Sequence, residues 1–136
     1  SSLRALVHKS DAVHSPSDYR GVLKSLLASN PDNGLARQYL LCLDIITKNL
    51  DFFIEDYDPA RDDSRLYDEA VLIYLVQRGA MTQQNLAHFG ISQEILQEFS
   101  DYNNMSYLNQ GAMEPMQQKY GKTYWFFYQY AKRHIK

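Results

Sequence analysis

Side chains that could act as nucleophiles or metal ligands are few in this chain and stand far apart. The one cysteine, Cys42, lies among Leu40, Leu41 and Leu43, with no histidine close to it in the sequence. A catalytic thiolate needs a nearby histidine or an electropositive pocket, so this context predicts a buried, unreactive Cys42. The four histidines form neither an i, i+4 pair nor a His-Glu-x-x-His motif: they are His8, His14, His88 and His134. We therefore expect no catalytic residue, no metal site and no cofactor.

The stretch from residue 55 to residue 63 is rich in carboxylates, the ligands that calcium prefers. Its acids include Asp56, Asp58, Asp62 and Asp63. The calcium-loop spacing with a central glycine and a final glutamate is missing, and Arg61 interrupts the acids. The stretch predicts a solvated loop whose negative charge favours the N-terminus of the next helix.

Aromatic residues crowd the end of the chain, where Tyr124, Trp125, Phe126, Phe127 and Tyr128 follow one another. On a helix, five consecutive side chains point around the whole circumference, so one core-facing stripe cannot cover them all. One interpretation wedges this helix between its neighbours as the closing element of the core. The other gives part of the run to a partner, because Tyr and Trp are frequent in binding hot spots. The candidate partner-binding residues are Tyr120, Tyr124, Trp125 and Tyr128, with Tyr102 and Tyr107 as further lining.

Composition favours one globular domain over residues 1–136. The chain is 45% hydrophobic, and 14 basic against 16 acidic side chains leave a formal charge of −2. No block of positive charge would gather phosphates, so nucleic acid is not an expected partner. No apolar run approaches the ~20 residues that a bilayer span requires. A single cysteine rules out an internal disulfide.

Apolar residues recur at steps of three and four along the chain, and strand patterns are nearly absent. Seven to nine helices are expected, the first of them around Leu3, Leu6 and Val7. Expected breaks are Asn49, the pair Asn103-Asn104 and a kink near Pro115. Five residues are candidate N-caps: Ser15, Ser64, Thr82, Ser92 and Thr123.

Short turns make consecutive helices antiparallel neighbours. The expected fold is therefore all-α, built of antiparallel helical hairpins as a tetratricopeptide-like α-solenoid or an irregular helical bundle. The segment YRGVLKSLLASNPDNGLARQYLLCLDIITKNLDFFIEDY, from Tyr19 to Tyr57, resembles the join between two tetratricopeptide repeats. Pro31 matches the closing proline and Leu40 the first-helix leucine. Leu41 and Phe53 stand where a standard repeat has small residues, so the resemblance is to a degenerate repeat.

Three strings also resemble the C-terminal region of an uncharacterised family of bacterial membrane proteins. They are GLARQYLLCLDIITKNLDFF from Gly34, YDEAVLIYL from Tyr67 and QQKYGKTYWFFYQYAK from Gln117. In that family a multi-span N-terminal part precedes a soluble helical tail. The resemblance implies that this chain is a fragment of a longer protein, tethered to the bacterial inner membrane through a preceding region.

Two functions are compatible with these patterns. The first is a helical protein-protein interaction domain that is not an enzyme and recruits an unidentified protein partner; a dimerisation or capping role is hard to separate from it. The alternative is a small-ligand or enzymatic domain, whose acids and tyrosines would meet in a pocket with perturbed pKa values.

Overall fold

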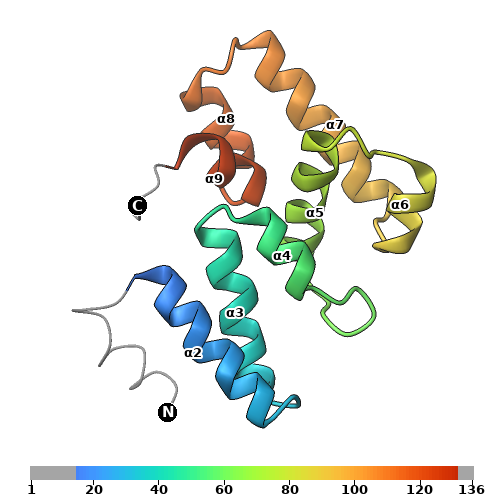
Figure 1. The fold of residues 1–136 in the computed structure, drawn as a ribbon. Helices are drawn as coiled ribbons and strands as arrows, with labels where there is room; N and C mark the ends of the chain where they lie inside the picture. Colours follow the sequence, from blue (N-terminus) through green and yellow to red (C-terminus); the bar gives the residue numbers. More distant parts are fainter. Residues whose placement is uncertain (1–14, 132–136) are drawn as a thin grey trace. The chain divides into compact units, whose positions relative to one another are not determined.

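The structure is a computed structural model and describes residues 15–131. Eight helices and no strand lie in this range, which confirms the all-α class. The chain divides into two compact units that join between Asp56 and Tyr57 (Figure 1). Organisation as one domain stays a prediction. The helix expected around Leu3 and Leu6 lies outside the described residues, as do three of the histidines: His8, His14 and His134.

The first unit is built on a hairpin of two helices followed by a short third one. Its elements are α2 (Pro16–Ser29), α3 (Gly34–Ile46) and α4 (Leu50–Asp56). Ser15 caps α2 as expected, in a capping box with Asp18. Asn33 caps α3, where its Oδ1 accepts a hydrogen bond from the Ala36 N–H at 3.1 Å. The two long helices pack against each other through Leu23, Ala36 and Leu40.

The break between α3 and α4 falls where it was expected but uses a different residue. Asn49 was expected to end the helix, because asparagine tolerates the left-handed conformation, but the residue in that conformation is Lys48, with φ 61°. The Asn49 N–H donates to the Asp44 carbonyl at 2.8 Å and its own carbonyl accepts from Phe53 N–H. Asn49 is therefore hydrogen-bonded to the last turn of α3 and to the first turn of α4. The chain changes direction at Lys48, the residue before it.

The second unit contains five helices, four of which begin at the caps that the sequence predicts. They are α5 (Arg65–Gln77), α6 (Gln83–His88), α7 (Gln93–Leu108), α8 (Met113–Tyr120) and α9 (Tyr124–Tyr130). The side chains of Ser64, Thr82, Ser92 and Thr123 each accept a hydrogen bond from a backbone N–H in the first turn of α5, α6, α7 and α9. All four predicted caps are confirmed, because capping depends on a local donor and a local acceptor.

The predicted end of α7 at Asn103-Asn104 is wrong, since the helix runs on to Leu108. Both asparagine side chains are exposed and stay in water. Tyr102 beside them is buried in the core, with its ring 5.8 Å from that of Trp125. We infer that this packing carries the helix past two residues that disfavour it locally.

The chain reverses later, at Gln110 and Gly111, whose φ angles are 54° and 74°. Pro115 lies in the first turn of α8, where a missing N–H costs no helical hydrogen bond. In place of the kinked helix expected near Pro115, the chain has two separate helices joined by a turn, and Pro115 follows that turn.

The core of the second unit is aromatic and gathers side chains from four helices. Its buried members are Leu72, Phe99, Tyr102, Met116, Tyr120 and Trp125. Helix α5 packs against both α7 and α9, although α5 and α9 are far apart in the sequence. Such long-range pairing is typical of an irregular helical bundle, one of the two architectures expected. Stacking of the tetratricopeptide type stays a prediction.

Candidate functional site

The aromatic helix α9 is packed into the second unit, so most of the four candidate partner-binding residues lie in its interior. Tyr120, Tyr124 and Trp125 are buried, and Trp125 has no exposed surface at all. Tyr128 is half-buried, and its hydroxyl accepts a hydrogen bond from the Gln77 side chain at 2.6 Å. The core interpretation thus describes Trp125 and its buried neighbours. Partner binding through the four stays a prediction, and Tyr128 is the one among them with a partly accessible side chain.

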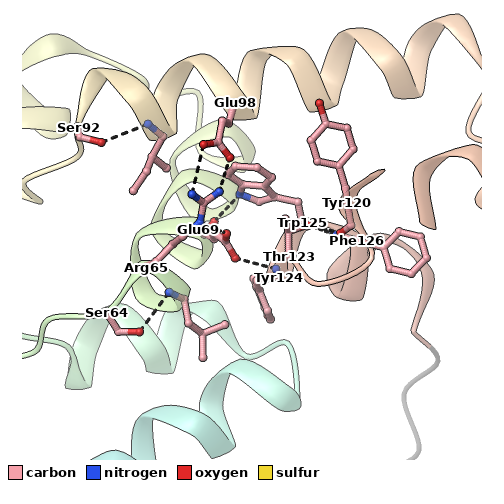
Figure 2. Close-up of polar contacts among 12 residues, drawn as sticks. Ser64, Arg65, Glu69, Ser92, Glu98, Tyr120, Thr123, Tyr124, Trp125 and Phe126 are labelled. Atoms are coloured by element: carbon pink, nitrogen blue, oxygen red, sulfur yellow. Dashed lines mark hydrogen bonds and ion pairs between the residues drawn. The ribbon is translucent and has the colours of Figure 1, made fainter. Parts of the chain in front are cut away.

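Glu69 on α5 anchors the start of α9. Figure 2 shows its carboxylate between Arg65 and the backbone of Tyr124. Its Oε1 accepts the Tyr124 N–H at 2.8 Å and its Oε2 accepts the Arg65 Nε–H at 2.8 Å. The indole N–H of Trp125 donates to the Glu69 backbone carbonyl at 3.0 Å. Although Glu69 is buried, its carboxylate has donors on both oxygens, which is the condition for keeping a charge inside a protein.

Arg65 extends this network to α7. Its guanidinium forms two hydrogen bonds with Glu98, at 3.3 Å and 2.5 Å (Figure 2). The hydrogen bonds with Glu98 and Glu69 raise the pKa of Arg65. The hydrogen bond with Arg65 lowers the pKa of Glu98. Arg65, Glu69, Lys122 and Thr123 also line a depression of about 420 Å³. Because Arg65 and Glu69 already bind each other, the arrangement is that of a structural clamp.

Elsewhere in the second unit, the turn between α7 and α8 carries large apolar side chains in water. Tyr107 is 83% exposed, Leu108 is 77% exposed and Met113 is 50% exposed. No charged residue occurs from residue 102 to residue 113. We call Tyr107, Leu108 and Met113 the apolar turn; it joins the two helices drawn in orange in Figure 1.

In the first unit, a cluster of charged residues is buried where α2, α3 and α4 meet. Arg20 on α2 reaches Asp44 on α3 through Nε at 3.2 Å, and Asp56 at the end of α4 through Nη2 at 2.8 Å. Lys24 contacts Asp56 at 3.2 Å. The Arg20 guanidinium also lies 3.9 Å from the centre of the Phe52 ring, a cation–π contact. One arginine thereby ties three helices together.

The two carboxyl groups of this cluster differ in their affinity for protons. Burial, followed by the hydrogen bond and charge of Asp56, raises the pKa of Asp44 to about 8, although Arg20 acts in the opposite direction. Burial also acts to raise the pKa of Asp56, but hydrogen bonds with Asp44, Arg20 and Lys24 lower it overall. Adjacent carboxyl groups behave in this way when one of them keeps its proton.

The remaining candidates from the sequence lie apart from these clusters. Cys42 is half-buried, and burial raises the pKa of its thiol, which disfavours the reactive thiolate. In the acidic loop, Asp58 accepts the Ala60 N–H at 3.0 Å and Asp62 accepts the Asp58 N–H at 2.8 Å. These acids bind the backbone of their own loop. Within residues 15–131, no three metal-ligating side chains gather closely enough to hold an ion.

A family model covers residues 1–131 of the chain. The chain belongs to DUF6057, a family of unknown function. No curated protein matches the chain, and no solved structure does. None of the helices described for this DUF6057 chain is long and apolar enough to cross a membrane.

Sequence reasoning missed two features of this DUF6057 chain. Asp44 interrupts the apolar run from Leu40 to Ile46, and a lone carboxylate among buried residues is a signal that it needs a partner. The apolar turn had a weaker signal, because exposure of Tyr107 and Leu108 depends on where α7 ends.

Proposed function

We propose that this chain is a protein-protein interaction domain that binds its partner through the apolar turn, and that it is not an enzyme. The observation that carries the proposal is the exposure of Tyr107 and Leu108, 83% and 77%, in a unit that buries most of its other aromatic side chains. Neighbouring large apolar side chains in water cost free energy unless a partner covers them. Tyrosine is among the residues that contribute most to binding when they are covered.

The chemistry of the partner follows from the lack of charge on the turn. Between Asp101 and Glu114 the chain offers apolar surface and neutral amides but no ionic group. An apolar recess on the partner would suit Tyr107, Leu108 and Met113, with the side chains of Asn109 and Gln110 at the rim. Because such contacts are not ionic, binding should depend little on salt concentration.

The test compares three forms of the chain as bait in a lysate of the source organism, at low and high salt. The turn variant carries Tyr107→Ser and Leu108→Ser, and the matched control carries Asn103→Ser and Asn104→Ser on the same helix. All four residues are exposed, so both variants should keep the circular dichroism spectrum of the parent chain. We expect the parent and the control to capture the same protein, and the turn variant to bind it about tenfold or more weakly.

A partner that binds the turn variant as tightly as the parent would contradict the role of the apolar turn. In that case Tyr128 is the next residue to change, since it is the accessible member of the four aromatic candidates. A partner that is lost at high salt would point to a charged surface.

We further propose that the natural protein attaches this domain to a membrane-spanning region and that the first unit is a degenerate tetratricopeptide-like repeat. The resemblance of three strings to the soluble tail of bacterial membrane proteins supports the first part. The α2–α3 hairpin, with Pro31 in its turn, supports the second. Antibodies against this domain should detect the natural protein in the membrane fraction of the source organism, and recovery in the soluble fraction alone would contradict the tether.

A further inference from the structure

One buried atom in the first unit lacks a hydrogen bond. The Asp44 side chain is 1% exposed, and its Oδ2 has no hydrogen-bond partner among the described residues. Its Oδ1 is bound by Arg20 at 3.2 Å. A buried carboxylate oxygen without a donor has lost its water and gained nothing in exchange, so the group requires an explanation.

The surroundings of Asp44 show why a proton is the ligand that fits. The second carboxyl group, Asp56, lies near Asp44 because one guanidinium binds both: Arg20 contacts Asp44 through Nε at 3.2 Å and Asp56 through Nη2. Asp56 is itself held by Arg20 at 2.8 Å and Lys24 at 3.2 Å. Two ionised carboxylates so near each other repel, whereas a proton on one of them converts the repulsion into a hydrogen bond.

We propose that Asp44 holds a proton at neutral pH and shares it with Asp56, and that release of this proton at higher pH loosens α2 from α3 and α4. The proton occupies the carboxyl group whose Oδ2 otherwise has no partner. Arg20 then balances a pair of acids that carries a single negative charge. Deprotonation adds a second negative charge on Asp44. Lys24 contacts Asp56, so Arg20 is the described cation that meets this charge while it also binds Asp56, and the contact that ties three helices together weakens.

The charged groups in contact with the pair or with Lys24 come, within residues 15–56, from three helices. Helix α2 supplies Arg20 and Lys24. Helix α3 supplies Arg37, whose Nη2 donates to the Asp56 backbone carbonyl at 2.8 Å. Helix α4 supplies Glu55, which lies 4.0 Å from Lys24 and is largely in water. The arginines keep their charge at all accessible pH values, so the acids decide the response.

The direction of the pH response follows from the shifts. The pKa of Asp44 is raised to about 8 in the folded chain, against ~3.9 for an aspartate in an unfolded chain. Its stabilising contribution is therefore complete below pH ~4 and is lost as the pH rises toward 8. The pKa of Asp56 is lowered, so its contribution is present above pH ~4 and does not change within this window.

The first test is a titration of the 136-residue chain, followed by NMR of ¹³C-labelled aspartate carboxyl carbons. We expect one carbon with a midpoint near 8, which is absent in Asp44→Asn. In Asp56→Asn the second acid is gone, and the midpoint of Asp44 should fall by at least one pH unit. An Asp44 that titrates like an exposed aspartate, or a midpoint unmoved by Asp56→Asn, would overturn the proposal. The Asp56→Asn arm also keeps the test decisive should Asp44→Asn fail to fold.

The second test concerns the helices and uses amide hydrogen exchange of residues 16–29, expressed as protection factors at pH 6 and pH 9. In Asp44→Asn, the new side-chain amide donates a hydrogen bond as the protonated acid does, but it does not titrate. We therefore expect protection of α2 to fall in the parent chain, by up to about tenfold for each pH unit between 6 and 8. In Asp44→Asn it should remain constant. Equal behaviour of the two chains would show that the proton does not hold α2.

Discussion

Replacing Trp125 with alanine is expected to unfold the second unit or to bring it close to unfolding. The indole has no exposed surface, packs against Phe99 and Tyr102 at ring distances of 5.1 Å and 5.8 Å, and donates to the Glu69 carbonyl. Removing a buried tryptophan costs about 3–5 kcal/mol of unfolding free energy. Since the total unfolding free energy of a small domain is about 5–15 kcal/mol, this loss is a large part of the stability of the unit.

Urea unfolding followed by far-ultraviolet circular dichroism measures this loss. Tyr128→Ala is the matched control, because Tyr128 lies on the same helix but is only half-buried. We expect the control to cost about 1 kcal/mol or less, for one lost hydrogen bond with Gln77 and partial burial. Equal costs for the two substitutions would mean that α9 does not enter the core in solution.

Replacing Glu69 with leucine is expected to detach the start of α9 while leaving the volume of the side chain nearly unchanged. The substitution removes the acceptor for the Tyr124 N–H and one of the two acids that bind Arg65. Both lost contacts involve a charged group, so we expect a cost of about 2–4 kcal/mol. Glu69→Gln keeps an oxygen for the Tyr124 N–H and should cost about half as much.

Trp125 is the single tryptophan of the chain, and its fluorescence therefore reports on this clamp directly. The Glu69→Leu variant should emit at longer wavelength and unfold at lower urea concentration than Glu69→Gln. Glu98→Gln is the control for the outer arm of the network, since Glu98 is partly exposed and an ion pair in contact with water contributes little to stability. If Glu98→Gln costs as much as Glu69→Leu, the stabilisation belongs to the Arg65–Glu98 pair.

Local features of the fold could be predicted from the sequence because their causes are local. Ser64, Thr82, Ser92 and Thr123 cap helices through donors two or three residues away. Any chain that turns into a helix at these residues makes the same hydrogen bonds. The all-α class follows in the same way from apolar residues at steps of three and four.

The same reasoning failed where tertiary contacts compete with local preference. Asn103 and Asn104 favour a helix end, yet α7 continues because Tyr102 is fixed in the core. At the end of α3, Lys48 adopts the left-handed conformation, and the backbone of Asn49 forms hydrogen bonds with both flanking helices.

By itself, the sequence determined an all-α chain, the starts of most helices, and a terminal aromatic run too wide for one core-facing stripe. Only the tertiary structure decided that Trp125 is core, that Tyr107 and Leu108 are in water, and that Asp44 meets Asp56. The physical reason is that capping and periodicity involve neighbours along the chain, whereas burial and proton affinity depend on residues from other helices. The Tyr124 N–H and the Glu69 carboxylate are 55 residues apart, and no pattern in the sequence links them.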